Sequence, residues 1–316
     1  MSQSPHRPSA RRTSLLFGVL LCGSLCSVPA GAEELNCPPL TESTATHAVP
    51  EHHRHGLLWR ISKQGRPASH LFGTIHLPDE DVARLPEPVA MVLARSRSFV
   101  MEAILDGPDM DTWTRQILET NSHSLRDQLG RALYERSARL LTTYGIPLEA
   151  IDLMKPWTVY LTLSTPPTTG GLPLDLALAH RAESDGKKVF GLETVSEQID
   201  SIASLPQDDQ IALVKDAVCH YDTVQDDIRR MKQLYLERDL AGLVSAANRY
   251  DLMESPRYQR LIGKLLSERN ERLYQRMISH LESGEAFIAV GALHLPGEHG
   301  VLGLLEHAGY AVEPVF

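Results

Sequence analysis

Residues 69–78, SHLFGTIHLP, lead from an apolar strand directly into a Gly-x-x-His-Leu-Pro turn, and residues 286–296, AFIAVGALHLP, repeat this pattern near the other end of the chain. Glycine allows a sharp turn or a close backbone approach, and proline fixes the exit from the turn. Each imidazole, His76 and His294, is therefore expected at the carboxyl end of a strand, which is the edge where open α/β sheets bind ligands. Two histidines in matched settings favour one shared site.

Further strand and helix signals lie between these two turns. LLWRIS, a turn at KQGRPA and SHLFGTIH predict a β-hairpin, and short apolar runs predict strands at 98–103 and 187–194. Apolar residues at helical spacing predict helices at 125–144, 207–221, 225–247 and 256–282. We expect an α/β fold with two related β-containing halves joined by a large helical middle section.

The two histidines are far apart in the sequence, at positions 76 and 294. If the two halves pair about a pseudo-twofold axis, His76 and His294 face one crevice, close to Glu102 and Arg269. A shared metal ion then requires the two imidazoles to lie within roughly 4–7 Å of each other, because each donor atom binds at about 2 Å. A separation above about 10 Å would exclude a common metal site.

Two acidic residues also end apolar strands, Glu102 after SFVM and Glu193 after VFGL. A carboxylate that closes a buried strand needs a partner, because an unpaired buried charge is costly. A functional role is the preferred interpretation for Glu102. For Glu193, function and a structural role in a salt bridge or near a helix start remain open.

Two polar residues interrupt the apolar stripe of the helix predicted at 256–282. Arg269 lies on the line of Leu265 and Leu273, and Asn270 lies beside it. Polar groups on a core-facing stripe must find hydrogen-bond partners, and carboxylates or a bound substrate would serve. The alternative, an Arg269 side chain that reaches out at the edge of the stripe, stays open.

The first 32 residues have the pattern of a cleavable signal peptide. Arg7, Arg11 and Arg12 precede an apolar run at 15–28, and Ala30-Gly31-Ala32 is a small-x-small cleavage site. The run of about 14 residues is shorter than the roughly 20 needed for a membrane span. We therefore expect export to a periplasm or to the outside of the cell, without a membrane span.

Residues 33–56 are rich in Pro, Thr, Ser and His and predict a disordered linker. Four histidines in it could bind metal loosely, although a solvated tail is the preferred interpretation: His47, His52, His53 and His55. Two cysteines remain after signal cleavage, Cys37 and Cys219, and whether they form a disulfide stays open. The net charge of −9 disfavours nucleic-acid binding.

At this level of detail the sequence resembles a known family. LLWRIS…SHLFGTIHLPD, FVMEA, MKPW, GLPLDLAL…GKKVFGLETVSEQI, ERN at 268–270 and AFIAVGALHLPGEHG together resemble the TraB/GumN family, whose animal relatives are the TIKI metalloproteases. The resemblance covers residues 57–316 and implies one α/β domain there. It also implies membership of a superfamily that includes erythromycin-esterase-like (EreA-like) enzymes and haem-binding ChaN lipoproteins.

The resemblance implies a function as well. In the TIKI branch, two Gly-x-x-His histidines and a glutamate are linked to manganese- or cobalt-dependent peptide cleavage, which assigns His76, His294 and Glu102 as metal ligands. Zinc is the alternative ion. We expect an exported metal-dependent hydrolase, a peptidase, acting on a peptide or small-molecule substrate.

In this hypothesis Glu193 acts as the general base, and Arg269 with Asn270 orients the substrate or stabilises an oxyanion. Two other classes of function remain open. One is a protein that binds a metal, haem or a peptide without turnover, and the other is a metal-free esterase that uses histidine as a base.

Overall fold

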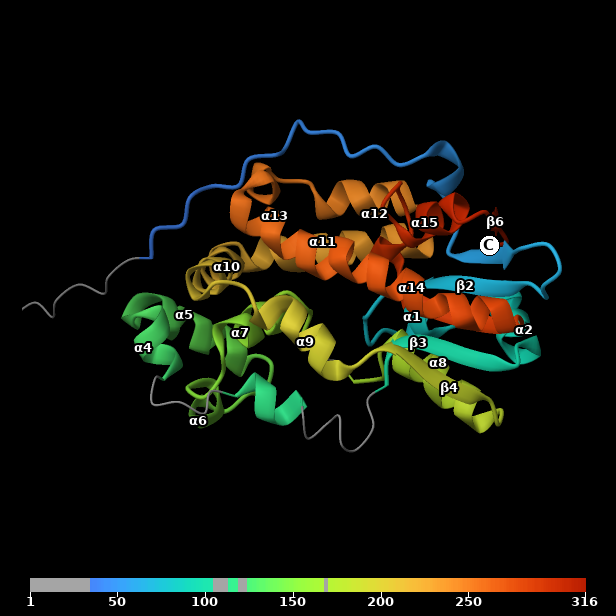
Figure 1. The fold of residues 1–316 in the computed structure, drawn as a ribbon. Helices are drawn as coiled ribbons and strands as arrows, with labels where there is room; N and C mark the ends of the chain where they lie inside the picture. Colours follow the sequence, from blue (N-terminus) through green and yellow to red (C-terminus); the bar gives the residue numbers. More distant parts are fainter. Residues whose placement is uncertain (1–34, 105–112, 119–123, 168–169) are drawn as a thin grey trace, which may run out of the picture. The chain divides into compact units, whose positions relative to one another are not determined.

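The computed structural model describes residues 35–104, 113–118, 124–167 and 170–316 (Figure 1). The expected signal peptide, residues 1–32, lies outside the described residues. Within the described ranges, no helix combines the length and the apolar character that a membrane crossing requires.

One mixed sheet contains the strands of the described residues, in the order β4-β3-β5-β2-β1-β6. The strands are β1 (Leu58–Ser62), β2 (Ser69–Thr74), β3 (Ser98–Ala103), β4 (Lys188–Glu193), β5 (Ala286–Gly291) and β6 (Ala311–Pro314). Strands β4, β3, β5 and β2 are parallel, whereas β1 and β6 extend the sheet with antiparallel pairs. The α/β class, the hairpin and the predicted strands are confirmed.

The two Gly-x-x-His strands are direct neighbours in this sheet. β2 pairs in parallel with β5, with Thr74 opposite Gly291, so both turns leave the same edge side by side. Direct strand pairing is thus what brings the two histidine turns together. On its other side β2 pairs with β1 in antiparallel direction, whereas β5 pairs with β3 in parallel. The similarity between the two segments is therefore limited to one strand and the turn that follows it.

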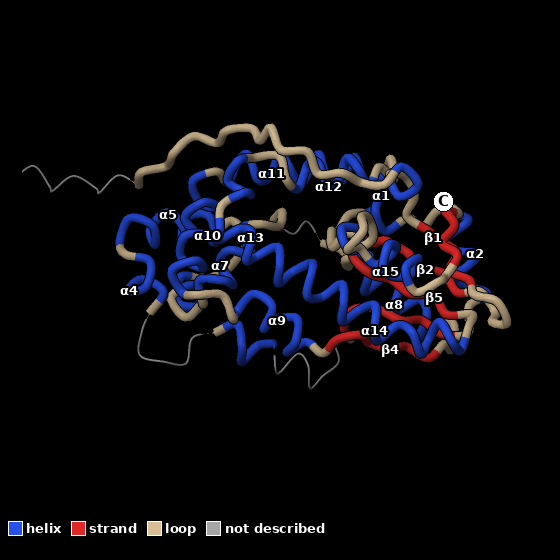
Figure 2. Tube along the Cα trace, turned by 45° about the horizontal axis from the view of Figure 1, so that its top comes forward, coloured by secondary structure: helices blue, strands red, loops and turns tan. Residues whose placement is uncertain are grey.

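Helices and short helical turns make up most of the remaining described chain (Figures 1 and 2). The helices are α1 (Glu80–Ala83), α2 (Glu87–Arg95), α4 (Leu125–Leu129), α5 (Arg131–Thr142), α6 (Leu148–Ile151), α7 (Pro156–Leu163), α8 (Leu174–Ser184), α9 (Val195–Ala203), α10 (Gln207–Cys219), α11 (Tyr221–Leu236), α12 (Leu240–Ala247), α13 (Pro256–Ile262), α14 (Glu268–Ser283) and α15 (Val301–His307). The turns are η1 (Glu51–His53), η2 (Asp251–Glu254), η3 (Gly263–Ser267) and η4 (Ala292–His294). The single helix predicted at 225–247 is wrong in one respect, because Arg238 adopts a positive φ of 61° and Asp239 caps a new helix.

Two apolar cores meet near the carboxyl edge of the sheet. One core fills the space around the strands with α8 and α14, and the other lies among α4, α5, α7 and α10. A third cluster joins them, with Trp157 of α7, Ile199 of α9 and Leu261 of α13 among its members. In Figure 1 the strands gather on the right and α4 to α7 on the left.

The helix predicted at 256–282 is interrupted by one π-helical turn, η3, between α13 and α14. Figure 2 shows α14 extending from beside the strands toward the other helices. Arg269 and Asn270 follow the π turn directly and are buried. π turns are frequent at functional sites because they change the direction in which the following side chains project.

The segment from Leu35 to Gly56 differs from the expected disordered linker. A disulfide joins Cys37 to Cys219 at the end of α10, which settles the open question of their pairing. Further along, Glu42 pairs with Tyr250 in a β-bridge and accepts hydrogen bonds from Arg249. The composition of the segment lacks apolar periodicity, so these individual attachments could not be predicted from it.

Candidate active site

The expected metal ligands meet around Gly291, at the end of β5. Nothing larger than hydrogen fits on the glycine Cα without close contact, because a Cβ built there would lie 3.3 Å from His294 Cδ2, 3.4 Å from Glu102 Oε1 and 3.9 Å from His76 Nε2. Since all three atoms lie within 3.9 Å of one point, no pair of them is separated by more than twice that distance. His76, Glu102 and His294 therefore lie close together around Gly291, as the strand-end pattern predicts, but only His76 and Glu102 line the adjacent cavity and His294 is buried behind them.

His294 lies in the η4 turn and is almost fully buried. Its Nδ1 is 2.6 Å from Asn270 Oδ1, and its Nε2 is 3.7 Å from Glu102 Oε1. Burial lowers the pKa of His294 to about 4, so the imidazole is neutral at pH 7. Because Nδ1 donates its proton to the Asn270 oxygen, Nε2 presents a bare lone pair toward the carboxylate.

His76 is held by an acid that sequence reasoning missed. Asp175, near the start of α8, accepts a hydrogen bond from His76 Nδ1 at 2.6 Å and another from the Thr74 hydroxyl. Burial alone would lower the pKa of His76, but the Asp175 carboxylate raises it to about 9. The His76 side chain is 61% exposed, so its Nε2 is free to face a ligand.

Glu102 is surrounded by donors. Its Oε1 accepts from the Gly291 amide at 2.7 Å, and its Oε2 accepts from Arg269 at 2.6 Å and from Gln198 at 3.1 Å. Burial alone would raise the pKa of Glu102, but the neighbouring His294 and Arg269 side chains lower it to about 2. The carboxylate thus stays ionised in a buried position.

Glu193 does not have the position of a general base. Its Oε2 accepts two hydrogen bonds from Arg269, at 2.8 and 2.9 Å, and its Oε1 accepts one from Arg272 at 2.8 Å. The Glu193 side chain is 0% exposed, so no substrate or water reaches it from the cavity. Two arginines satisfy this carboxylate, which is the geometry of the salt-bridge alternative left open by the sequence.

Asn270 also differs from its expected role. Its Oδ1 accepts from His294, and its Nδ2 donates to the His299 carbonyl at 2.9 Å. Both ends of the amide are occupied, an arrangement that orients the His294 ring. Arg269 bridges Glu102 and Glu193 and lines the cavity, which excludes the alternative of a side chain reaching into solvent.

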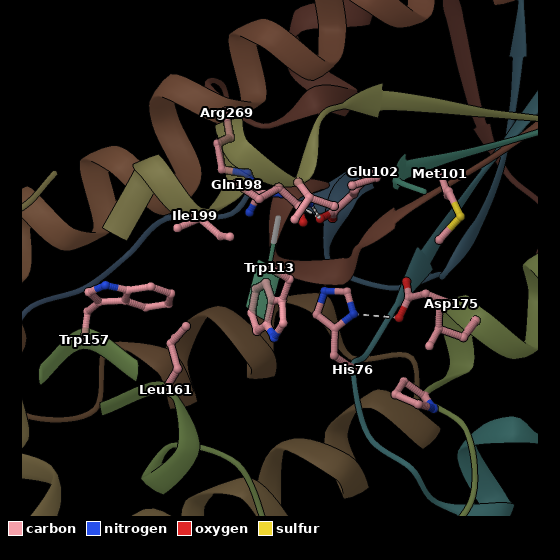
Figure 3. A pocket seen from close by; sticks show the side chains of 14 residues that line it. His76, Met101, Glu102, Trp113, Trp157, Leu161, Asp175, Gln198, Ile199 and Arg269 are labelled. Atoms are coloured by element: carbon pink, nitrogen blue, oxygen red, sulfur yellow. Dashed lines mark hydrogen bonds and ion pairs between the residues drawn. The ribbon is translucent and has the colours of Figure 1, made fainter. Parts of the chain in front are cut away.

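A cavity of about 490 Å³ opens beside these residues (Figure 3). One part of its wall is polar: His76, Glu102, Asp175, Gln198 and Arg269. The opposite part is apolar: Trp113, Trp157, Leu161, Val195 and Ile199. In Figure 3 Trp113 stands next to His76 and Trp157 lies beyond it, so the apolar wall begins where the polar one ends.

Weak signals existed for the residues that sequence reasoning missed. Asp175 is the single acid within the apolar run GLPLDLAL, and Gln198 follows the Thr194–Glu197 capping box of α9. Trp157 ends the MKPW motif of the family resemblance, whereas Trp113 belongs to none of the quoted motifs. Their place in the wall depends on how the helices pack onto the sheet edge.

Two imidazoles and a carboxylate, from His76, His294 and Glu102, are ligand types that bind divalent metal ions. Histidine ligands of metals usually donate the second ring nitrogen to a carboxylate or carbonyl, which fixes the tautomer and aims the first nitrogen at the ion. Asp175 does this for His76, and Asn270 does it for His294. Among the described residues the three donors do not all lie within 4.8 Å of one another, so binding requires the exposed His76 ring to move inward.

Known proteins of similar sequence provide information that is independent of this geometry. The model of the TraB/PrgY/gumN family matches residues 57–314. The uncharacterized protein YbaP of Shigella flexneri is 25% identical over 75% of this chain and 88% of its own length. Metalloprotease TIKI2 of Danio rerio is 26% identical over 81% of this chain, which spans 60% of that protein. Metalloprotease TIKI1 of Homo sapiens is 24% identical over 93% of this chain and 68% of its own length. No solved structure matches.

Proposed function

Because the chain belongs to the TraB/PrgY/gumN family, we propose that it is a metal-dependent hydrolase that cleaves peptide bonds. Distant similarity to two proteins named metalloproteases supports the hydrolase class. The observation that carries the proposal is the approach of His294 Nε2 and Glu102 Oε1 to 3.7 Å. A neutral imidazole lone pair and a carboxylate oxygen are both acceptors, and a cation between them satisfies both.

His76, His294 and Glu102 would hold the ion, with manganese or cobalt expected from the resemblance and zinc as the alternative. When bound, a divalent ion polarises the scissile carbonyl and lowers the pKa of its water ligand. The protein residues prepare this centre. Asp175 and Asn270 orient the two imidazoles, and the Gly291 amide with Arg269 keeps Glu102 ionised and fixed.

Arg269 also gives the cavity a permanent positive charge. Glu193 and Glu102 hold its guanidinium at the polar wall, where charge that develops on a carbonyl oxygen would be stabilised. The apolar wall with Trp113 and Trp157 then suits an apolar side chain of the substrate, next to the bond that is cleaved.

Export is part of the proposal. The leader at residues 1–32 has the features that a signal peptidase recognises. The Cys37–Cys219 disulfide supports it independently, because disulfides persist mainly in oxidising compartments such as the periplasm or the extracellular space.

The test is cleavage of a peptide library by chelator-stripped protein, with and without added manganese or cobalt. We expect cleavage only with metal, and its loss in His294→Ala. His180→Ala is the matched control, because His180 is exposed on α8, the helix that carries Asp175. One equivalent of tightly bound metal without cleavage of any peptide would favour a binding protein instead.

A metal-free hydrolase is the second candidate, and one contact favours it. The His76–Asp175 hydrogen bond of 2.6 Å resembles the histidine and orienting acid of a hydrolytic triad, and His76 Nε2 can accept a proton once the pH exceeds the His76 pKa of about 9. Ester hydrolysis that persists in chelator and disappears in His76→Ala would establish this candidate. Activity that chelator abolishes would exclude it.

A further inference from the structure

A second group of metal-ligand side chains lies outside the cavity. His52 and His53 belong to η1, and Glu306 belongs to α15 near the other end of the chain. His52 Nε2 is 3.1 Å from Glu306 Oε1, and His53 Nε2 is 3.2 Å from the same oxygen. One donor atom from each of the three residues lies within 4.8 Å of the other two.

The burial of His53 is not explained by an ordinary surface ion pair. Its side chain is 1% exposed, its Nδ1 has no hydrogen-bond partner among the described residues, and its Nε2 lies 3.2 Å from Glu306 Oε1 without the alignment of a good hydrogen bond. Its ring packs edge-on against Trp59, with 5.8 Å between ring centroids. A buried imidazole without a partner is costly, whereas the exposed contact of His52 with Glu306 is common on protein surfaces.

The spacing of the three donors agrees with coordination of one ion. Bonds of about 2.0–2.2 Å to a tetrahedral centre place neighbouring donors roughly 3.3 Å apart. The two measured separations, 3.1 and 3.2 Å, are close to this value. His52 is 60% exposed, which leaves the fourth position open to water.

We propose that His52, His53 and Glu306 form a second metal site, for a divalent transition ion of the zinc type. Two imidazoles and one carboxylate are a frequent zinc ligand set. The ion would fasten η1 to α15 through three protein ligands and keep a water molecule in its fourth position. This proposal does not depend on the proposed hydrolase activity, because none of its ligands lines the cavity.

The test isolates this site by removing the other one. Full-length chelator-stripped protein carrying His76→Ala and His294→Ala is titrated with zinc chloride in a calorimeter. We expect one equivalent to bind, and we expect His52→Ala or Glu306→Gln on that background to weaken binding at least 100-fold. His55→Ala is the matched control, because His55 is exposed in the same segment and should leave the affinity unchanged.

Two measurements keep the result decisive. Thermal unfolding without metal checks that the His52 and Glu306 variants fold, and X-ray absorption of the zinc-loaded background protein should show two imidazole nitrogens. If the background protein binds no zinc, or His52→Ala retains full affinity, the second site is refuted. If wild type binds one equivalent that only His52→Ala removes, the second site stands and the proposed catalytic metal centre fails.

Discussion

Replacing Arg269 by methionine tests the charge arrangement of the site most directly. Arg269 donates to Glu193 at 2.8 and 2.9 Å and to Glu102 at 2.6 Å, and those side chains are 0% and 7% exposed. Removing one partner of a buried ion pair costs about 3–5 kcal/mol, because the remaining charge stays buried. Arg272 still contacts Glu193, so we expect a loss near the lower end, about 3 kcal/mol, in the free energy of unfolding.

Urea unfolding measures this loss, and a thermal melt should fall by roughly 6–12 °C. Arg260→Met is the control, because Arg260 is 49% exposed where it pairs with Asp209, and such surface pairs contribute under about 1 kcal/mol. Adding Glu193→Gln to Arg269→Met should restore part of the stability, since it removes an uncompensated charge. The reasoning is refuted if Arg269→Met costs no more than the control, or if the double variant is as unstable as the single one.

Three further predictions concern other contacts. Asp175→Asn should weaken manganese binding about 10–100-fold in a calorimetric titration, because it removes the charged partner of His76; an unchanged affinity would contradict this role. Hydrogen bonds from Arg276 lower the pKa of Glu197 to about 2 from its usual 4.5, so this stabilisation exists above the unfolded-state pKa and disappears as pH falls toward 2. Glu197→Gln should therefore be about 1 kcal/mol less stable than wild type at pH 7 and equally stable near pH 2 in melts across pH, whereas a constant difference would argue against the ion pair. Cys37→Ser should lower the unfolding free energy by about 2–5 kcal/mol in urea and make it insensitive to reductant; equal stability of variant and wild type would show that the disulfide contributes nothing.

The strand ends were the part of the site that local sequence could predict. An apolar run that ends in a polar residue indicates the carboxyl end of a strand, which is why His76, Glu102 and His294 could be expected near one edge of the sheet. Their partners depend on contacts between distant segments. Asp175 lies 99 positions from the histidine that it orients, and nothing in its own neighbourhood indicates that pairing.

The same limit explains why the contacts of Glu193 differ from those of a general base. The sequence around an acidic residue at a strand end is similar whether its side chain faces a cavity or contacts two arginines. The sequence therefore could not distinguish the surroundings of Glu193 from those of Glu102. The segment at 33–56 was read by composition alone, which does not record a disulfide partner at Cys219 or a bridge to Tyr250. Local patterns predicted the elements, and packing decided what each polar side chain does.

The strand order also has a consequence for biosynthesis. β3 and β2 each pair with β5 and not with each other, so the sheet stays in two separate pieces until residues 286–291 have left the ribosome. Pairing between segments so far apart in the chain is slow to form. Since His294 directly follows β5, a nascent chain that lacks β5 holds only His76 after β2 and Glu102 in β3. The proposed metal centre can therefore be complete only after translation has passed residue 294, shortly before the last strand, and a product truncated before β5 would lack it.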